Sequence, residues 1–192
     1  MSEALYLPFD CESGGIGKEV SLLSAHFAAC DKDFNVIDEL NLLLKPKDLD
    51  DTGQPIYKVC ARALEINKID LIKHNAVAIS QSEAGQQLRN FLWKYSENGK
   101  RYLIPTGKNI GGDIDWVNTH VLGKREWSKY VSYRTYDITS LLISLKRKGK
   151  LPADAPDSLQ GICEFFGIQA EWHSARGDNL AGIEVIKRLE SL

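Results

Sequence analysis

Apolar and polar side chains alternate over residues 3–12, and two apolar runs of β-compatible composition follow at 19–30 and 35–45, patterns typical of β-strands. Leu5, Leu7 and Phe9 fall on one face of an extended chain, whereas Asp10 and Glu12 fall on the other. The predicted strands cover residues 3–12, 19–30 and 35–45. Because only turn-length segments separate these strands, we expect them to form an antiparallel meander.

Helical periodicity governs most of the remaining chain. Ser80 and Glu83 form a capping box, and the apolar residues that follow recur at helical spacing until about Gly99. Further helices are predicted over residues 111–122, 137–149, 157–166 and 175–192, with strands at 101–106 and 131–136 and a loop at 46–60. This order of elements indicates an α/β fold, with a mixed five-stranded sheet flanked by helices.

The composition indicates one globular domain over residues 1–192. Of the 192 residues, 43% are hydrophobic and 26% are charged, and no apolar run approaches the roughly 20 residues that a membrane span requires. The N-terminus has no basic segment, so we expect no secretory signal. The four cysteines, Cys11, Cys30, Cys60 and Cys163, stand far apart, which predicts reduced thiols in a cytoplasmic protein. The net charge of −2 argues against a protein that coats long duplexes, but it suits a site rich in carboxylates.

Asp10 and Glu12 are the first candidates for chemistry. They stand two apart at the end of a predicted strand, so both side chains leave the same face beside a glycine-rich turn. Like charges this close repel, and one carboxyl would take up a proton unless a cation bridged the pair. Taken alone, the pair also fits a chance arrangement on the surface.

Asp178 heads a stripe on the last helix that continues through Ala181, Val185 and Leu189. The three later residues are apolar, so the stripe faces the core, where an aspartate is costly unless it is paired or binds a metal. His173 lies five residues earlier, at or before the start of the helix. Taken alone, it fits a loop histidine that caps or packs.

Asp113 aligns with Trp116 and Val117 on the inward face of its helix, whereas Asp115 falls on the solvent face. Asn109 precedes the helix and is expected to cap it. Taken alone, Asp113 also fits an aspartate that the helix dipole favours in the first turn.

The four carboxylates at the ends of predicted elements are Asp10, Glu12, Asp113 and Asp178. Ligand sets made of oxygen suit Mg²⁺ or Mn²⁺. Two such ions about 4 Å apart can hold an attacking water and a leaving oxygen for phosphodiester cleavage. A nearby His173 could take the proton of the water, because imidazoles titrate near neutral pH.

Three segments resemble, in the right order, the Exo motifs of the DEDDh exonucleases, a family with polymerase proofreading subunits, ribonuclease T and oligoribonuclease. Residues 9–15 are similar to F-D-x-E-T-T-G, residues 107–113 to G-H-N-x-x-F-D, and residues 173–178 to H-x-A-x-x-D. Residues 137–142 and 159–168 resemble family segments that lie between the second and third motifs. The similarity thus covers nearly the whole chain, and Ser174, where a sister branch has tyrosine, indicates the histidine branch.

The resemblance implies an RNase H-like fold and a 3′→5′ exonuclease that trims single-stranded DNA or RNA. It implies that Asp10, Glu12, Asp113 and Asp178 bind two Mg²⁺ or Mn²⁺ ions, with Asp10 bridging both ions, and that His173 is the general base. Substrate contacts are expected from Ser13, Gly14, Asn109 and Arg134. Residues 133–136, which include Arg134, resemble a segment of oligoribonuclease, and relatives of that type are often dimers, so a homodimer is a further expectation.

The chain departs from the family pattern at several positions. Pro8 stands in a predicted central strand, where it removes a ladder donor, so a bulge or local distortion is expected. Ser13 replaces a threonine, and Lys108 stands where histidine is frequent. Gly112 replaces an aromatic residue, which changes the packing expected beneath the terminal nucleotide.

Two alternatives to the exonuclease stay open at this point. The first is a metal phosphodiesterase on the same scaffold that acts on small nucleotides. The second is a non-catalytic nucleic-acid-binding module, against which the intact carboxylates argue, because an unused cluster of like charges destabilises a protein.

Overall fold

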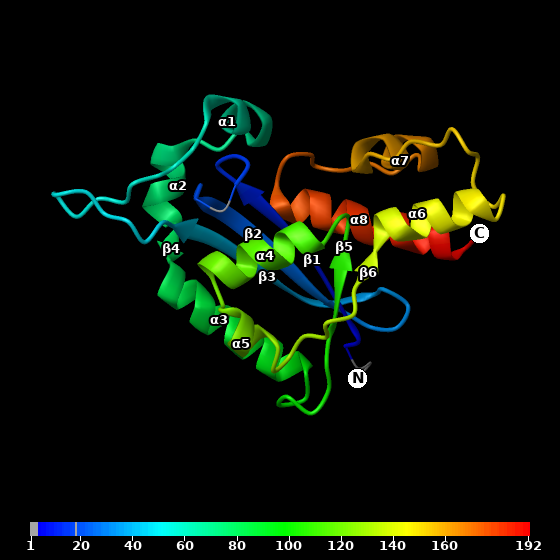
Figure 1. Ribbon diagram of the computed structural model, residues 1–192, viewed down its shortest axis with the longest axis horizontal. Coiled ribbons are helices and arrows are strands. Elements are labelled where there is room, and N and C mark those ends of the chain that lie inside the picture. The colour runs from blue at the N-terminus through cyan, green and yellow to red at the C-terminus, as the bar shows by residue number, and fades with distance from the viewer. Residues whose placement is uncertain (1–3, 18) are drawn as a thin grey trace.

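The computed structural model describes residues 4–17 and 19–192, and its centre is a six-stranded mixed sheet (Figure 1). The strands are β1 (Tyr6–Ser13), β2 (Leu22–Cys30), β3 (Val36–Lys45), β4 (Ile79–Ser80), β5 (Ile104–Gly107) and β6 (Tyr136–Asp137). Their order is β4-β3-β2-β1-β5-β6, in which β1, β2 and β3 pair antiparallel and β5 lies parallel to β1. The predicted meander and the mixed character of the sheet are confirmed.

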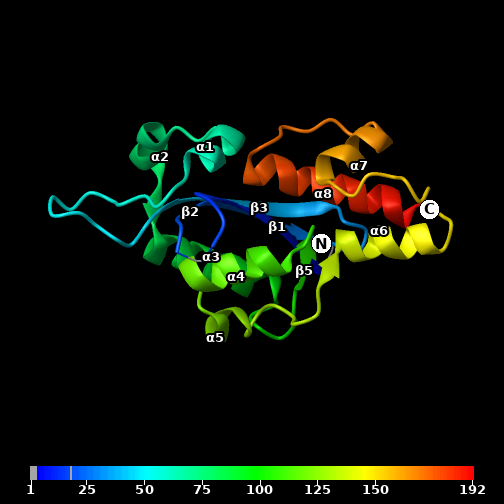
Figure 2. The same cartoon turned by 45° about the horizontal axis from the view of Figure 1, so that its top comes forward.

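Helices cover both faces of the sheet. They are α1 (Ala61–Asn67), α2 (Leu71–Val77), α3 (Gln81–Tyr95), α4 (Gly111–His120), α5 (Lys124–Trp127), α6 (Ile138–Arg147), α7 (Leu159–Phe166) and α8 (Ala175–Glu190). Figure 2 shows α8 and α7 on one face and α3 and α4 on the other. Each face has its own hydrophobic cluster, and all nine residues of β2 are buried between the two. Burial on both faces explains why residues 22–30 are mostly apolar, with only Ser24 and His26 as polar members.

The predicted helix starts are confirmed where a side-chain cap marks them. Ser80 accepts a hydrogen bond from the backbone N–H of Glu83 at the start of α3. Asp137 accepts bonds from Thr139 and Ser140 at the start of α6. These caps satisfy N–H groups that the first helical turn leaves without partners.

The described residues contain short elements that the hydrophobic pattern did not predict. Helices α1 and α2 have seven residues each and are mostly exposed, so they show little amphipathic periodicity. Strand β4 has two residues and pairs in parallel with the end of β3, which makes the sheet six-stranded instead of five-stranded. Elements this short depend on tertiary contacts more than on their own sequence.

Pro8 does not shift the register of the central strand. Tyr6 pairs with Cys30 and Phe9 pairs with Phe27, so the antiparallel register is the same before and after Pro8. The register shift of β1 lies instead between Glu12 and Ser13. No bulge therefore forms at Pro8, but Leu7 and Pro8 have no paired partner in β2, which fits the alternative expectation of a local distortion. The register shift falls instead beside the candidate site.

The structure bears on three further expectations, which concern the cysteines, membrane-spanning segments and a secretory signal. All four cysteines are free thiols. No helix among the described residues is long and apolar enough to cross a membrane. Residues 1–3, part of the segment on which the expectation about a secretory signal depends, lie outside the described residues.

Candidate active site

Three carboxylates meet where the end of β1 approaches the first turn of α8. Asp10 and Glu12 belong to β1, and Asp178 stands in the first turn of α8, which packs on β1 and β2. Within the described residues, these three side chains each offer an oxygen that lies within 4.8 Å of the others. The fold thus brings together carboxylates from opposite ends of the chain.

Burial and repulsion disfavour the ionised forms of these carboxyls. Burial, followed by the charges of Asp113, Glu12 and Asp178, raises the pKa of Asp10 well above its ordinary value. Burial, followed by Asp178 and Asp113, raises the pKa of Glu12 to about 7. Such carboxyls hold protons near neutral pH unless a cation compensates their charge.

Asp113 joins this cluster from α4, although it stands outside the group of three within 4.8 Å. Burial raises its pKa to about 7, and hydrogen bonds that include those from Cys11 limit the rise. Cys11 lies between Asp10 and Glu12 in β1, so it links Asp113 to the other carboxylates. As predicted, Val117 is buried on the inward face of α4 and Asp115 is exposed.

The start of α4 is held differently from the prediction. The N-cap residue is Ile110, and it makes no side-chain cap, so the cap expected from Asn109 is wrong. The Asn109 side chain instead accepts a hydrogen bond of 2.8 Å from the hydroxyl of Thr139. Asp137, which caps α6, also accepts a bond of 3.0 Å from the backbone N–H of Ile110. Tertiary contacts with α6 therefore fix the entry to α4, and with it Asp113.

His173 lies in the bend immediately before α8. Its φ of 68° is in the left-handed region, which is uncommon outside glycine and is compatible with a tightly constrained turn. Burial raises the pKa of Asp178, and the backbone N–H and the charge of His173 offset part of that rise. The structure therefore places His173 beside Asp178, as the sequence predicted.

Gly177 allows α8 to approach the chain segment before it. A Cβ atom at this position would collide with the carbonyl oxygen of Glu171. Ser174, the N-cap of α8, accepts a hydrogen bond of 3.0 Å from the N–H of Gly177. A side chain at position 177 would therefore displace the turn that carries both His173 and Asp178.

One carboxylate oxygen in the cluster is left without a protein partner. Oδ1 of Asp178 is buried and has no hydrogen-bond partner among the described residues. Buried polar atoms nearly always have a partner, and a divalent cation would be one for a carboxylate. Because the surrounding candidate ligands are also carboxylates, the residues fit Mg²⁺ or Mn²⁺.

Two of the residues expected to contact substrate, Ser13 and Gly14, follow Glu12 directly in the chain. Ser13 donates a hydrogen bond of 2.7 Å to the carbonyl of Gly15 and so stabilises the turn after β1. Gly14 packs tightly, because a Cβ there would lie 2.6 Å from the carbonyl oxygen of Lys58. Arg134 is exposed, with its guanidinium 5.5 Å from the ring centroid of Tyr133. The contact of Arg134 with substrate therefore stays a prediction.

The position of the missing aromatic residue is open space. A Cβ at Gly112 would meet no heavy atom of the described residues within 4 Å. Gly112 lines a small pocket of about 160 Å³ with Gly17, Asp115, Trp116 and Thr119. Trp116, one turn after Gly112, thus supplies aromatic surface near the position that the family pattern fills with an aromatic side chain.

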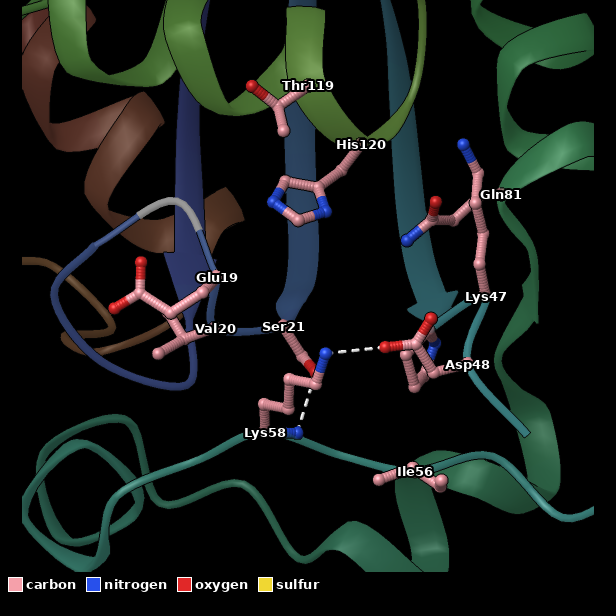
Figure 3. A pocket seen from close by; sticks show the side chains of 11 residues that line it. Glu19, Val20, Ser21, Lys47, Asp48, Ile56, Lys58, Gln81, Thr119 and His120 are labelled. Atoms are coloured by element: carbon pink, nitrogen blue, oxygen red, sulfur yellow. Dashed lines mark hydrogen bonds and ion pairs between the residues drawn. The ribbon is translucent and has the colours of Figure 1, made fainter. Parts of the chain in front are cut away.

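A second, larger pocket lies beyond the turn after β1. Figure 3 shows it between the chain before β2, the end of α4 and the segment after β3. It has a volume of about 220 Å³ and includes Ser21, Asp48, Lys58 and His120 in its lining. The Nζ of Lys58 forms an ion pair with Asp48 and lies 2.5 Å from its Oδ2. The backbone N–H of Lys58 donates a hydrogen bond of 2.9 Å to the hydroxyl oxygen of Ser21. No pattern in the sequence predicted this pocket, because the residues that line it are ordinary loop and helix-end positions.

The fold and the site define an α/β protein with an acidic cluster at the end of its central strand. No family model matches the sequence, and no curated protein matches it. Solved structures do match. E. coli exonuclease I in complex with a dT13 oligonucleotide is 17% identical, with a TM-score of 0.71 over 98% of this chain and 41% of that chain. Exonuclease I from Methylocaldum szegediense is 18% identical, with a TM-score of 0.67 over 97% of this chain and 40% of that chain.

The chain therefore spans about two fifths of the length of these exonucleases. A product-bound exonuclease I gives a similar result, with 16% identity and a TM-score of 0.70 over 99% of this chain. At this level of identity the likeness shows the fold, and it extends over nearly the whole chain. The RNase H-like fold predicted from the sequence is confirmed.

Proposed function

We propose that the protein is a metal-dependent 3′→5′ exonuclease that acts on single-stranded nucleic acid. The observation that carries the proposal is the meeting of Asp10, Glu12 and Asp178 within 4.8 Å at the end of the central strand. Two facts support it: the fold is that of exonuclease I, and the sequence resembles the three Exo motifs in order.

The carboxylates are the groups that would hold the metal. Asp10 would hold it together with Glu12, Asp113 and Asp178, whose charges all act on Asp10. Mg²⁺ or Mn²⁺, when bound, supplies the positive charge that stabilises the oxygens of a phosphodiester during in-line cleavage. The carboxylates would hold the cations in place, and their burial excludes water that would screen these charges.

His173 is proposed as the general base. It stands in the bend beside Asp178, where an imidazole can accept a proton from water at neutral pH. The left-handed backbone holds it at the edge of the cluster.

The substrate is proposed to be a single-stranded 3′ end. One of the similar structures, E. coli exonuclease I, is in complex with a dT13 oligonucleotide. A net charge of −2 suits an enzyme that grips a few terminal nucleotides rather than a long duplex. Ser13, Gly14, Asn109 and Arg134 are the proposed contacts, and Trp116 offers a surface on which a base can stack. The homodimer and the cytoplasmic location stay predictions.

The test is a gel assay with 5′-labelled single-stranded DNA and RNA of equal sequence, with Mg²⁺ and with EDTA. The variant Asp178→Ala removes a proposed ligand, and Asp48→Ala is the matched control, because Asp48 lies in the pocket of Figure 3. We expect a ladder that shortens from the 3′ end with wild type and Asp48→Ala, and none with EDTA or Asp178→Ala. The faster substrate identifies the preferred polymer.

Two results would contradict the proposal in different ways. Cleavage by Asp178→Ala at the wild-type rate would remove the metal assignment. If clean wild-type protein leaves both polymers intact, the same samples should be tested with small nucleotide phosphodiesters and by gel shift. Those measurements separate a small-nucleotide phosphodiesterase from a binding module.

A further inference from the structure

A buried asparagine follows the proposed metal ligand on α8. Asn179 is 5% exposed, although the other buried residues of α8 are glycine or apolar. Its side-chain amide nitrogen lies 3.1 Å from the carbonyl oxygen of Pro8 and 2.9 Å from Nδ1 of His26. The same nitrogen lies 3.3 Å from the carbonyl oxygen of His26. A buried amide that only filled space would be replaced at lower cost by an apolar side chain.

The hydrogen bonds continue from Asn179 to the surface of the sheet. His26 is fully buried in β2, and its Nε2 lies 3.0 Å from Oε2 of Glu39 in β3. Arg176 in the first turn of α8 donates to both carboxylate oxygens of Glu39, at 2.8 and 3.2 Å. The chain of contacts leaves α8 at Asn179 and returns to α8 at Arg176. We call these four residues, Asn179, His26, Glu39 and Arg176, the α8 anchor.

One protonation state satisfies the whole α8 anchor. Asn179 donates to Nδ1 of His26, so Nδ1 carries no proton and Nε2–H donates to Glu39. Burial lowers the pKa of His26, which favours this neutral ring. Burial would raise the pKa of Glu39, but the hydrogen bonds from Arg176 and His26 outweigh it and lower the pKa. Fully satisfied buried networks are rigid, because every alternative position leaves a polar atom without a partner.

The two ends of the α8 anchor lie beside the proposed metal ligands. Asn179 is the neighbour of Asp178 in the chain, and Arg176 is two residues before it. On the sheet, Pro8 is two residues before Asp10, and His26 is the cross-strand partner of Asp10. The contacts therefore join the backbone that carries Asp178 to the backbone that carries Asp10, without using either carboxylate.

We infer that the α8 anchor is a positioning device that sets the distance between Asp178 and Asp10 and so shapes the metal site. The inference builds on the proposed function, in which these carboxylates bind Mg²⁺ or Mn²⁺. Because the carboxylates repel one another before a cation binds, an external restraint is needed to keep them together. The anchor supplies that restraint from the buried interface between α8 and the sheet, through groups other than the two carboxylates.

The test measures Mn²⁺ binding directly, by the loss of the electron paramagnetic resonance signal of free Mn²⁺ on titration with protein. We expect Asn179→Ala to weaken Mn²⁺ binding by about 10- to 100-fold, the usual effect of removing a group that orients metal ligands. Val185→Ala is the matched control, because Val185 is fully buried on the same helix, remote from the anchor. It is expected to lower the melting temperature while Mn²⁺ affinity stays close to wild type.

A second variant keeps the test decisive if Asn179→Ala fails to fold. Arg176→Met leaves the buried members in place and removes a side chain that is half exposed, so it is expected to fold. A smaller loss of Mn²⁺ affinity in the same direction is the expected result, together with a lower kcat and an unchanged KM for nucleic acid. If the anchor had only a structural role, Arg176→Met would lower the melting temperature and leave the Mn²⁺ affinity and kcat unchanged.

The outcomes separate this inference from the proposed function. Equal Mn²⁺ affinity of wild type, Asn179→Ala and Arg176→Met overturns the inference, even if wild type cleaves nucleic acid. Mn²⁺ binding without cleavage by wild type overturns the proposed function, and the variants still decide the inference. If wild type binds no Mn²⁺, both are wrong.

Discussion

Two charged regions flank the turn after β1, and they differ in how their charges are balanced. In the pocket of Figure 3, Asp48 pairs with Lys58, which lowers the pKa of Asp48. In the carboxylate cluster, burial and then the like charges of Asp113, Glu12 and Asp178 raise the pKa of Asp10. The charge of Asp48 is balanced by Lys58 within the folded chain, whereas the carboxylate cluster needs a proton or a cation to balance its charge.

This difference in charge balance says more about function than the volume of the pocket does. The pocket of Figure 3 is an open space of about 220 Å³, yet its ion pair is the kind that contributes little and requires no ligand. The cluster offers an orphaned, buried oxygen on Asp178 and carboxyls with raised pKa values. Unbalanced buried charge destabilises a protein, so it is informative about function wherever it is found.

The largest effect is expected from Asp10→Asn, which tests whether the unbalanced charge serves activity at the expense of stability. Cleavage is expected to fall below detection, because the amide cannot replace a bridging carboxylate. The melting temperature of the metal-free variant is expected to rise, because one of the mutually repelling charges is gone. Asp48→Asn is the control, with unchanged cleavage and no gain in stability, and a stabilised Asp48→Asn would erase the contrast between the two regions.

His173→Ala comes next in expected size. We expect kcat to fall by about 10²- to 10⁴-fold, the usual contribution of a general base. His74→Ala is the control, because His74 lies on α2, which supplies none of the proposed site residues, and its Nε2 lies 3.0 Å from the carbonyl oxygen of Leu44. Steady-state rates on a labelled oligonucleotide measure both variants. A loss below tenfold in His173→Ala would assign the base to another group.

Gly177→Ala tests how tightly the turn that carries the cluster is packed. The added methyl collides with the carbonyl of Glu171, so we expect a loss of about 1–3 kcal/mol in the free energy of unfolding. Cleavage is expected to fall as well, because His173 and Asp178 move with this turn. Gly123→Ala is the control, since a Cβ there meets no described atom within 4 Å, and denaturant unfolding measures both. Equal stability of the two variants would show that the turn yields easily.

The smallest effect is a pH dependence of stability in EDTA. Glu12 and Asp113 have pKa values of about 7 in the folded protein, above the value of about 4 expected in the unfolded chain. Their contribution to stability is therefore fully present below about pH 4 and is lost as the pH rises through about 7. We expect the melting temperature to fall between about pH 4 and pH 7 relative to Asp10→Asn, and Mg²⁺ to restore it. A flat profile would mean that the pKa values of Glu12 and Asp113 are not raised in the folded protein.

The sequence predicted much of the fold and most of the candidate site. Alternation in β1 and the apolar runs of β2 and β3 identified the central meander. Helical periodicity identified α3, α6 and α8, because each of these helices buries one face and begins at a side-chain cap. The same signals missed α1, α2 and β4, which are short and poorly periodic. The prediction that Asn109 caps α4 was wrong, because its side-chain oxygen accepts a hydrogen bond from the hydroxyl of Thr139 instead.

The sequence by itself determined which groups are available: carboxylates at the ends of elements, a histidine before the last helix, and motifs that resemble a nuclease family in order. Tertiary structure alone decided that Asp10, Glu12 and Asp178 meet within 4.8 Å, and that Asp113 stands slightly apart. It also decided that Asn179 and His26 lock α8 to the sheet. The physical reason is that local patterns record which face a residue occupies, whereas charge repulsion and hydrogen bonds across the core depend on distances that only the packed chain defines.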